Sequence, residues 1–581
     1  MGILLKQLRV HGFRGLDNLE VDFDPTTVLV GTNNAGKTTL LKSLQLALSN
    51  SLQITDDDFF FSEEINRDKI IIDVLFIPVD EDKKQIPEFE DLWSSVFTEN
   101  RIAIDSSGNQ ILSFRTIIEE NLIRKSYTKK QYLIDEWPDF EDAPNSFWYQ
   151  QDYQNSLNFY FDEIPFFYLD ANRDILEDLK SKNSFLGKIL SSINYNDADK
   201  KLIEDLIKNL NKETIERSDV LTNIHTVLEE LDTAMDNPNN SVDITPFTKK
   251  IRDLNKGVKI NYSQFSMEYH GMGTRSWSSL LILKAFILQN MKLANESQVA
   301  YYPIIAIEEP ESHLHPNAQK KLYSQINNII GQKIVATHSS YIAGSSRLKE
   351  IRSINKTNLK TTIGKLEESS YTAEDIRKIN RQVINTRGEL FFSKLVILFE
   401  GETEEQALPI TIEKHFQKSS IELGVDFIGV GGSGNYLPFI RFFETFNIPY
   451  LILSDNEAEA RDSVEKQIDK SKHQDLNKVV FLEDGNDFEK ELCENGYIEE
   501  VKNAYSILKL SECYNDQHRD AKRAELAQIP DEDYYDLIVN LKTQFAPIIA
   551  YELNKSEKGL PEKMIELFDK VDHILNPSTD E

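Results

Sequence analysis

Residues 31–38 read GTNNAGKT, which fits the pattern G-x-x-x-x-G-K-[ST] of a phosphate-binding loop in full. The apolar run TVLV lies directly before this loop, and the helical pattern TTLLKSLQLAL follows it. Gly31 and Gly36 would allow backbone N–H groups to surround a phosphate. Lys37 would add a positive charge, and Thr38 would hold Mg²⁺. A strand, a glycine-rich loop and a helix in this order predict an α/β domain with a nucleoside triphosphate site.

Two further strands are expected to complete this site. Residues 304–316 read IIAIEEPESHLHP, an apolar strand that ends in two adjacent carboxylates. Such a pair in an ATPase holds Mg²⁺ and activates water, so we assign Glu308 as the magnesium-side acid and Glu309 as the base. The strand KIVATHS ends in His338, which is placed to sense the γ-phosphate. The alternatives are two exposed glutamates at a strand end and a structural histidine.

In this order, VHGFRGL, GTNNAGKT, IEEPESHLHP and VATHS resemble the RecF/SMC-like branch of ABC-type ATPases. The resemblance implies that Arg14 approaches the nucleotide. It also implies a signature loop that binds the γ-phosphate of the opposing subunit. The best candidate is HGMGTRS at 270–276, with Gly271, Gly273 and Ser276, and a plain glycine-rich turn is the alternative. The predicted ATP-binding residues are Arg14, Gly31, Asn33, Asn34, Ala35, Gly36, Lys37, Thr38, Thr39, Glu308 and His338.

The C-terminal third carries four carboxylates at two predicted strand ends. The strand in KLVILFEGETEEQALP delivers Glu400, and the helix after it places Glu404 nearby. The strand in PYLILSDNEAEA ends in Asp455 and Glu457, whose alternate spacing points both side chains the same way. Carboxylate oxygens bind hard divalent cations, which can polarise a phosphodiester and activate water. For any one of these acids, the alternative is an ordinary surface position.

The E-G-x-x-E pattern and the later acidic dyad resemble the Toprim domain. The usual dyad is Asp-x-Asp, whereas this chain has Asp455-Asn456-Glu457, and the segment 429–435 resembles the glycine-rich turn of that domain. Lys542 lies in a segment that resembles a late Lys-x-x-x-Ala helix, although an exposed lysine is the alternative. The predicted catalytic residues are Glu400, Glu404, Asp455, Glu457, Lys542 and, in the ATPase, Glu309; the predicted metal ligands are Glu400, Glu404, Asp455, Glu457, Glu489 and Thr38.

Hydrophobic periodicity divides the chain into four segments. The predicted fold class is α/β: an ABC-type P-loop ATPase with a helical insertion, followed by a Toprim (Rossmann-like) domain. The ATPase would occupy residues 1–173 and 258–388, with the insertion at 174–257 serving dimerisation. The Toprim domain and C-terminal helices would occupy residues 389–581.

Composition narrows the class of protein. The chain has two cysteines and no run of 18 apolar residues, so we expect a cytoplasmic protein without a zinc framework or membrane contact. A net charge of −31 excludes a wholly basic nucleic-acid coat. Any DNA contacts are therefore expected on a local basic track, with binding that falls steeply as salt rises.

The combination of an ABC ATPase and a Toprim domain is similar to the architecture of the OLD (overcoming lysogenization defect) family. The resemblance implies an ATP-regulated DNA endonuclease that uses ATP and Mg²⁺ or Mn²⁺ and serves bacterial anti-phage defence. It also implies that the partners are DNA, further copies of the chain in a dimer or tetramer, and a helicase-like protein. The alternative is a DNA-repair or structural ABC ATPase whose Toprim domain does not cleave. A topoisomerase or primase would need a tyrosine-nucleophile domain or a template-binding module, and neither is evident.

Overall fold

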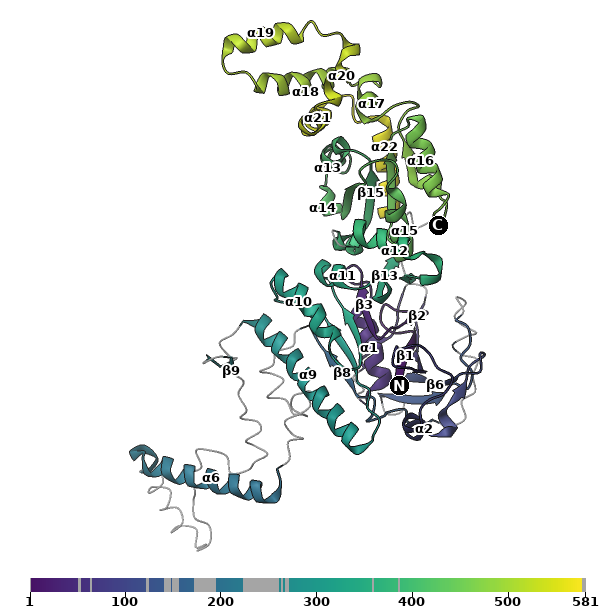
Figure 1. Ribbon diagram of the computed structural model, residues 1–581, viewed down its shortest axis with the longest axis vertical. Coiled ribbons are helices and arrows are strands. Elements are labelled where there is room, and N and C mark those ends of the chain that lie inside the picture. Colours follow the sequence, from purple (N-terminus) through teal and green to yellow (C-terminus); the bar gives the residue numbers. More distant parts are fainter. Residues whose placement is uncertain are drawn as a thin grey trace. The chain divides into compact units, whose positions relative to one another are not determined.

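The computed structural model describes residues 2–50, 54–62, 65–121, 125–140, 148, 156–171, 195–222, 261–262, 265–266, 271–357, 360–384 and 387–576. The chain divides into two compact units (Figure 1). Unit 1 contains Met1–Asp162, Pro316–Asn327 and Gln332–Glu581, and unit 2 contains Glu163–His315 and Asn328–Gly331. Within the described part of the chain, no helix has the length and apolar character needed to cross a membrane.

The first sheet of unit 1 is antiparallel and follows the order β2-β1-β4-β6-β5, with β7 also paired to β6. Alternating and apolar runs in the sequence indicate the strands β1, β2, β4 and β6. The central strand β4 reads KIIIDVLFIPV, and nearly all of its residues are buried, as expected for a strand covered on both faces. The strands are β1 Gly2–His11, β2 Leu19–Asp22, β4 Lys69–Val79, β5 Ala103–Ile104, β6 Gln110–Asn121 and β7 Ser126–Leu133; the short helix α2 covers Asp91–Phe97.

A second sheet in unit 1 follows the order β14-β13-β3-β12, in which β3 is parallel to both of its neighbours. All residues of β3 and β12 are buried, which matches their unbroken apolar sequences. Helix α1 follows β3 directly after the phosphate-binding pattern. The elements are β3 Thr26–Val30, α1 Lys37–Leu48, α10 Pro316–Asn327, β12 Gln332–Ala336, α11 Ser340–Ser345, β13 Ile351–Thr357, β14 Lys360–Lys365 and α12 Ala373–Ile379.

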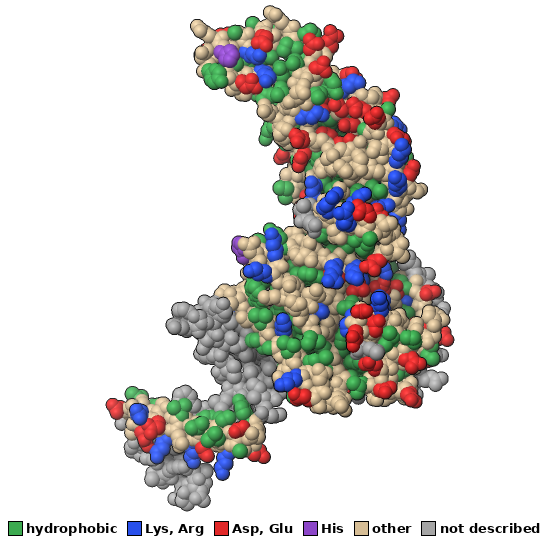
Figure 2. Space-filling model, viewed as in Figure 1, with side chains coloured by type: hydrophobic (Ala, Val, Ile, Leu, Met, Phe, Trp, Pro, Cys, Tyr) green, Lys and Arg blue, Asp and Glu red, His purple; other side chains and the backbone are tan. Residues whose placement is uncertain are grey.

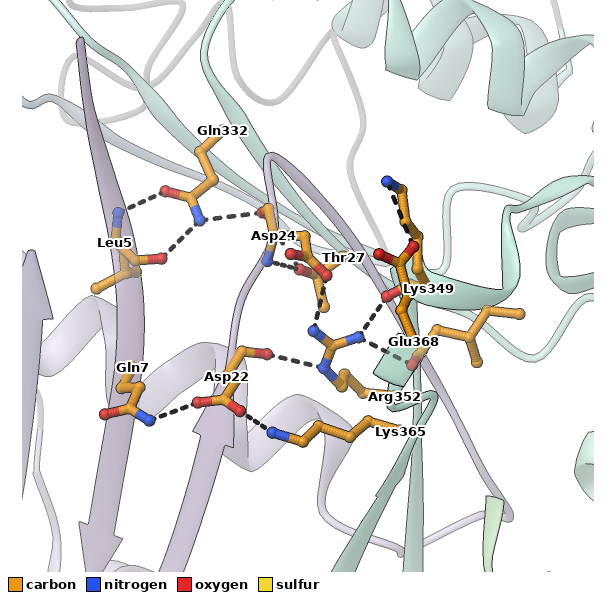
Figure 3. A network of polar contacts seen from close by, with 11 residues as sticks. Leu5, Gln7, Asp22, Asp24, Thr27, Gln332, Lys349, Arg352, Lys365 and Glu368 are labelled. Carbon is orange, nitrogen blue, oxygen red and sulfur yellow. Dashed lines mark hydrogen bonds and ion pairs between the residues drawn. The ribbon is translucent and has the colours of Figure 1, made fainter. Parts of the chain in front are cut away.

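A polar network joins the two sheets of unit 1 (Figure 3). The guanidinium of Arg352, at the start of β13, donates to the Asp22 carbonyl at 2.9 Å and to an Asp24 carboxylate oxygen at 2.8 Å. Lys365 on β14 pairs with the Asp22 carboxylate. The side chain of Gln332 satisfies both the N–H and the carbonyl of Leu5 on β1, at 2.9 and 2.8 Å. These bonds fix the start of β13 against the antiparallel sheet.

The C-terminal part of unit 1 contains a parallel sheet in the order β16-β15-β17-β18. The first strand in sequence, β15, lies between the second and the third, so the strand order reverses there. The apolar core of this sheet is shared with helix α13 and with helices α17 to α22. The strands are β15 Leu395–Phe399, β16 Val425–Gly429, β17 Tyr450–Ser454 and β18 Val479–Phe481; the helices are α13 Glu402–Phe416, α14 Ser420–Leu423, α15 Tyr436–Phe446, α16 Ala458–Ile468, α17 Phe488–Glu494, α18 Ile498–Ser511, α19 Asp516–Leu526, α20 Tyr534–Val539, α21 Lys542–Lys555 and α22 Glu562–Leu575.

Unit 2 contains the parallel pair β8 Phe166–Leu169 and β11 Ile304–Glu308, and the long helix α9 Met272–Ser297. A short hairpin joins β9 Asn261–Tyr262 to β10 Phe265–Ser266. The predicted helical insertion contributes α6 Asp197–Glu216, and most of its other residues lie outside the described residues. The three boundaries between the four predicted segments therefore stay predictions.

A buried ion pair generates the first prediction. Asp73 on β4 and Arg115 on β6 form two hydrogen bonds of 2.6 Å, and their side chains are 1% and 3% exposed. Replacing Asp73 by Ala would leave the guanidinium charge buried without its carboxylate. We expect Asp73→Ala to destabilise the fold by about 3–5 kcal/mol.

The measurement is the urea midpoint followed by tryptophan fluorescence. All tryptophans precede residue 300, so this signal reports on the N-terminal half: Trp93, Trp137, Trp148 and Trp277. The control is Lys130→Ala, which removes a half-exposed pair with Glu119 and should cost less than about 1 kcal/mol. Equal shifts for the two variants would contradict the prediction.

Candidate active site

The phosphate-binding pattern forms a loop between β3 and α1. Gly31 has φ 144°, and a Cβ there would lie 2.3 Å from the Ile354 carbonyl oxygen, so only glycine fits. Gly36 has φ 110° and precedes the helix. The Lys37 ammonium donates to the carbonyls of Gly31 at 2.7 Å and Thr32 at 2.9 Å, which holds it inside the loop.

This loop lines a pocket together with His338, which follows β12. The structure thus brings together two segments that are 300 residues apart in the sequence, as their positions after neighbouring parallel strands predict. Asn33 is exposed and does not line the pocket. The lining residues are Gly15, Asn34, Ala35, Gly36, Lys37, Thr38, Thr39 and His338.

Arg14 departs from the arrangement that the resemblance implied. Its guanidinium donates to Asp58 at 2.6 Å, and it lines a second pocket with Lys42 and Gln45, separate from the loop pocket. Burial acts to raise the pKa of Asp58, but hydrogen bonds from the Thr55 backbone and from Arg14 lower it. The Asp58 carboxylate therefore holds the Arg14 side chain. The next residue in the chain, Gly15, lines the loop pocket.

Asp17 holds several neighbouring residues together, and no sequence motif predicted this role. It accepts a hydrogen bond from the Gly12 N–H at 3.2 Å and contacts His11 and Arg67, each at 2.9 Å. These partners hold the turn that carries Arg14 and Gly15. The signal in the sequence is slight, because an acid after the HGFRGL segment has no motif of its own.

The Glu308–Glu309 pair ends β11 in unit 2. Glu308 is buried and accepts a hydrogen bond from the Tyr168 hydroxyl on β8 at 2.5 Å. Glu309 has φ 40° and accepts from the Ser312 hydroxyl at 3.1 Å. This turn after β11 holds the two carboxylates in different surroundings, one buried and one partly exposed. The role of Glu308 and Glu309 in one nucleotide site with the phosphate-binding loop stays a prediction.

The candidate signature segment begins helix α9 instead of forming a loop. Gly271 is the N-cap, and Gly273 and Ser276 lie in the first two helical turns. A Cβ on Gly273 would lie 2.4 Å from the His313 carbonyl oxygen, so this glycine permits close packing against the turn after Glu309. Its contact with an opposing subunit stays a prediction, and His270 lies outside the described residues.

The parallel sheet of the C-terminal part carries the predicted carboxylates at one edge. Glu400 follows β15 and Asp455 follows β17, and these strands are hydrogen-bonded neighbours. Strand order reverses at β15, which is the position where sites form in open α/β sheets. The Ser454 hydroxyl donates to Glu400 at 3.0 Å. Parallel pairing of β15 with β17 therefore explains why Glu400 and Asp455, which are 55 residues apart in the sequence, lie close together.

Glu404, Glu489 and Lys542 form the inner part of the same site. Glu404, on the first turn of α13, is buried and accepts from the Gly401 N–H at 3.3 Å. Glu489 on α17 is 1% exposed, and Lys542 at the start of α21 donates to it at 2.7 Å. Thr403 donates to the other oxygen of Glu489. The predicted Lys542 is thus an ion-paired residue of the carboxylate cluster and not a free surface lysine.

Burial and mutual repulsion change the proton affinity of this cluster. Burial, with repulsion by Glu489, raises the pKa of Glu404 to about 7. Burial and the charges of Glu404 and Glu400 raise the pKa of Asp455 to about 8. Burial also raises the pKa of Glu400. Neighbouring cations do not fully offset the negative charge of the cluster. Carboxyl pKa values that are raised in this way are typical of functional sites.

Glu457 and Asn456 have different roles. Glu457 is exposed and is the N-cap residue of α16. Asn456 is buried, and its amide donates to the Leu482 carbonyl at 2.7 Å. Its backbone N–H donates to the Asn486 carbonyl at 2.9 Å. Asn456 therefore holds the loop after β18, whereas Glu457 is the acid whose side chain is available to a ligand.

Tyr436 was not predicted and lies at the centre of the site. It is the first residue of α15, after the glycine-rich turn, and is fully buried. Its hydroxyl donates to the Leu453 carbonyl at 3.3 Å, and its proximity acts to lower the pKa of Glu400. Burial, with the charges of Glu400 and Glu404, raises the pKa of Tyr436. Tyr436 thus stays protonated as a neutral polar group beside Glu400.

The donor set fits a hard divalent cation. Among the described residues, no three acidic, histidine or cysteine side chains converge closely enough to define a metal site by geometry alone. The charges of Glu404 and Glu400 nevertheless raise the pKa of Asp455, and the charge of Glu489 raises the pKa of Glu404, so these carboxylates share one electrostatic environment. Like charges at this spacing repel, and a cation with oxygen preference would satisfy them. The residues present therefore suit Mg²⁺ or Mn²⁺.

Comparison with known proteins gives matches on both parts of the chain. The AAA ATPase domain family matches residues 4–343, and the TOPRIM domain family described as overcoming lysogenization defect protein-like matches residues 391–456. The predicted fold class, an ATPase domain followed by a Toprim domain, is confirmed at this level.

Two relatives match most of the chain. The protein named Endonuclease GajA from Bacillus cereus is 24% identical, with coverage of 80% of this chain and 78% of the relative. The protein named OLD nuclease from Thermus scotoductus is 22% identical, with coverage of 82% and 86%. A solved structure of the C-terminal region of the Burkholderia pseudomallei OLD protein is 17% identical, covers 32% of this chain and 99% of that chain, and has a TM-score of 0.24.

Asp17 generates a prediction about pH. Burial acts to raise its pKa, but the hydrogen bonds and charges of His11 and Arg67 lower the pKa from 3.8 to about 2. Its stabilisation is complete above the unfolded value and is lost as pH falls toward about 2. We therefore expect Asp17→Asn to lose about 2 kcal/mol of stability at pH 7, and the difference from wild type to shrink between about pH 4 and pH 2.

The measurement is the urea midpoint as a function of pH, compared between wild type and variant. Asp57→Asn, at an exposed acid near this turn, is the matched control and should follow the wild-type profile. A constant difference between wild type and Asp17→Asn over the whole acid range would show that the Asp17 charge does not stabilise the turn.

Proposed function

The chain belongs to the AAA ATPase domain family and carries an OLD-like TOPRIM domain, and from this we propose that it is an ATP-controlled, divalent-metal-dependent DNA endonuclease. The observation that carries the proposal is the cluster of buried carboxylates at the ends of two neighbouring parallel strands, β15 and β17. The names of the two relatives, Endonuclease GajA and OLD nuclease, support the same class of reaction.

In this proposal, Glu400, Glu404, Asp455 and Glu457 hold Mg²⁺ or Mn²⁺, with Glu489 as a further ligand. A divalent ion bound there would polarise the phosphodiester and lower the pKa of water. Ser454 orients Glu400 through a hydrogen bond of 3.0 Å, and Tyr436 lies beside it. Lys542 lies between Glu489 at 2.7 Å and Asp487 at 3.9 Å, and its ammonium would stabilise negative charge on the scissile phosphate.

The nucleotide site is proposed to regulate this cutting. ATP would bind at the loop pocket through Lys37 and the backbone of residues 31–39, with Thr38 on Mg²⁺ and His338 at the γ-phosphate. Glu308 and Glu309 would supply the magnesium-side acid and the base. The assignment of Lys37, Thr38 and His338 has support in the pocket that these residues line together.

DNA is the proposed substrate, and a local basic track is its expected contact. Figure 2 shows acidic and basic side chains on the same face, with Lys and Arg gathered near α12 and β13. The structure leaves several cations exposed in this stretch of the sequence: Lys349, Lys360, Lys378 and Arg381.

Self-association belongs to the proposal as well. On α6, within the predicted insertion, Leu202, Leu206 and Leu210 are 59%, 59% and 51% exposed at a spacing of four residues. Such a stripe on one helix face is typical of a helix–helix contact. A dimer or tetramer, a helicase-like partner and a role in bacterial anti-phage defence follow from the resemblance and stay predictions.

The decisive experiment compares Glu400→Gln and Glu404→Gln with wild type in cleavage of supercoiled and linear DNA with Mg²⁺ or Mn²⁺. We expect each variant to lose at least about a hundredfold in cleavage, because each removes a carboxylate from the metal site. The matched control is Glu405→Gln, an exposed acid on the same turn of α13, which should cleave like wild type.

Retained cleavage in both site variants would contradict the assignment of the carboxylate cluster. Absence of cleavage in wild type with both metals, together with intact ATP hydrolysis, would favour the alternative of an ATPase whose TOPRIM domain does not cleave.

A second experiment tests the nucleotide site. Lys37→Ala removes the ammonium that the loop carbonyls hold, so we expect ATP affinity to fall at least about tenfold and the effect of ATP on cleavage to disappear. Metal-dependent cleavage without nucleotide should continue, since Lys37 is remote in sequence from the carboxylate cluster. Lys42→Ala, on the same helix but outside the loop pocket, is the control. An unchanged response to ATP in Lys37→Ala would exclude this pocket as the regulatory site.

A further inference from the structure

The end of strand β13 lies beside the loop pocket. β13 pairs with β3 in parallel through Ile351, Arg352 and Ser353, and Ser353 is level with Val30, the last residue before the loop. The Ile354 carbonyl oxygen occupies the space that a Cβ on Gly31 would fill. The strand therefore continues past the point where the loop begins, and its last residues lie beside the phosphate-binding loop.

Lys356 directs its ammonium to the rim of this pocket. Its Nζ lies 3.0 Å from the position of a Cβ on Gly15, and Gly15 lines the pocket with residues 34–39 and His338. The glycine leaves room for the lysine side chain to pass. A side chain larger than hydrogen at residue 15 would displace the ammonium from this position.

The charge of Lys356 is not balanced by a neighbouring acid. Arg352 and Lys365 of the same hairpin, and Lys349 just before it, each form an ion pair with a carboxylate, and Figure 3 shows these three residues with their partners. For Lys356, no ion pair is present among the described residues of the chain. Arg14, the cation that the resemblance placed at the nucleotide, is instead paired with Asp58. Lys356 is thus the cation beside Gly15 that can accept an anionic partner.

We propose that Lys356 is a phosphate-contacting residue of the nucleotide site, which reaches a bound nucleoside triphosphate past Gly15. This inference rests on the proposed ATP site and adds a residue from outside its sequence motifs. The anchored start of β13 gives the contact a fixed geometry, because the Arg352 network holds the strand against the antiparallel sheet. The exposed position of the ammonium makes the contact sensitive to salt.

The test is the dissociation constant of ATP with Mg²⁺, measured calorimetrically on the full chain without DNA. We expect Lys356→Gln to weaken binding about three- to tenfold, the effect of one partly screened charge pair. Lys356→Arg keeps the charge and should bind within about twofold of wild type. The deficit of Lys356→Gln should shrink as salt rises, which a purely structural role of the side chain would not produce.

Lys378→Gln, at an exposed lysine on α12 outside the pocket, is the matched control and should bind ATP like wild type. Equal affinity in Lys356→Gln and Lys378→Gln, with wild type binding ATP and Lys37→Ala failing to bind it, would overturn this inference and leave the proposed function intact. Failure of wild type to bind ATP would overturn both the inference and the nucleotide part of the proposed function.

Discussion

Parallel strand pairing is the constraint on which both sites of unit 1 depend. Carboxyl ends of neighbouring parallel strands meet at one edge of a sheet, so residues distant in sequence become neighbours without any further contact. The pairing of β3 with β12 brings His338 to the phosphate-binding loop. The pairing of β15 with β17 brings Asp455 to Glu400. The second pairing is costly, because it gathers buried carboxylates whose pKa values rise in response.

The parts that the sequence predicted are those encoded locally. The loop at 31–38 requires glycines at two positions of positive φ, and these requirements are visible as residue types at fixed spacing. Glu400 and Asp455 follow apolar runs that form the buried strands β15 and β17. Strand, loop and helix patterns of this kind depend on few distant residues, so a single sequence is enough to recognise them.

The sequence did not predict which side chains contact one another over long distances in the chain. Arg14 pairs with Asp58, and Lys542 pairs with Glu489 across 53 positions, and neither pair has a characteristic spacing. Tyr436 joins the carboxylate site only because α15 begins at the sheet edge. These interactions depend on the packing of helices and turns around the sheets, which hydrophobic periodicity does not specify. The same holds for Gly273, whose close contact with His313 is a property of the packed helix α9.

Strand β13 lies beside the nucleotide pocket and contacts helix α15, whose other end lies at the carboxylate site. Beside Lys356, whose ammonium faces Gly15, the Asn355 amide donates to the Phe446 carbonyl at the end of α15, at 2.8 Å. A Cβ on Gly364 of β14 would lie 2.6 Å from the Phe446 backbone, so the hairpin packs tightly on that helix. The other end of α15 is Tyr436, which lies beside Glu400. One hairpin and one helix therefore lie in contact along the path from the nucleotide pocket to the carboxylate cluster.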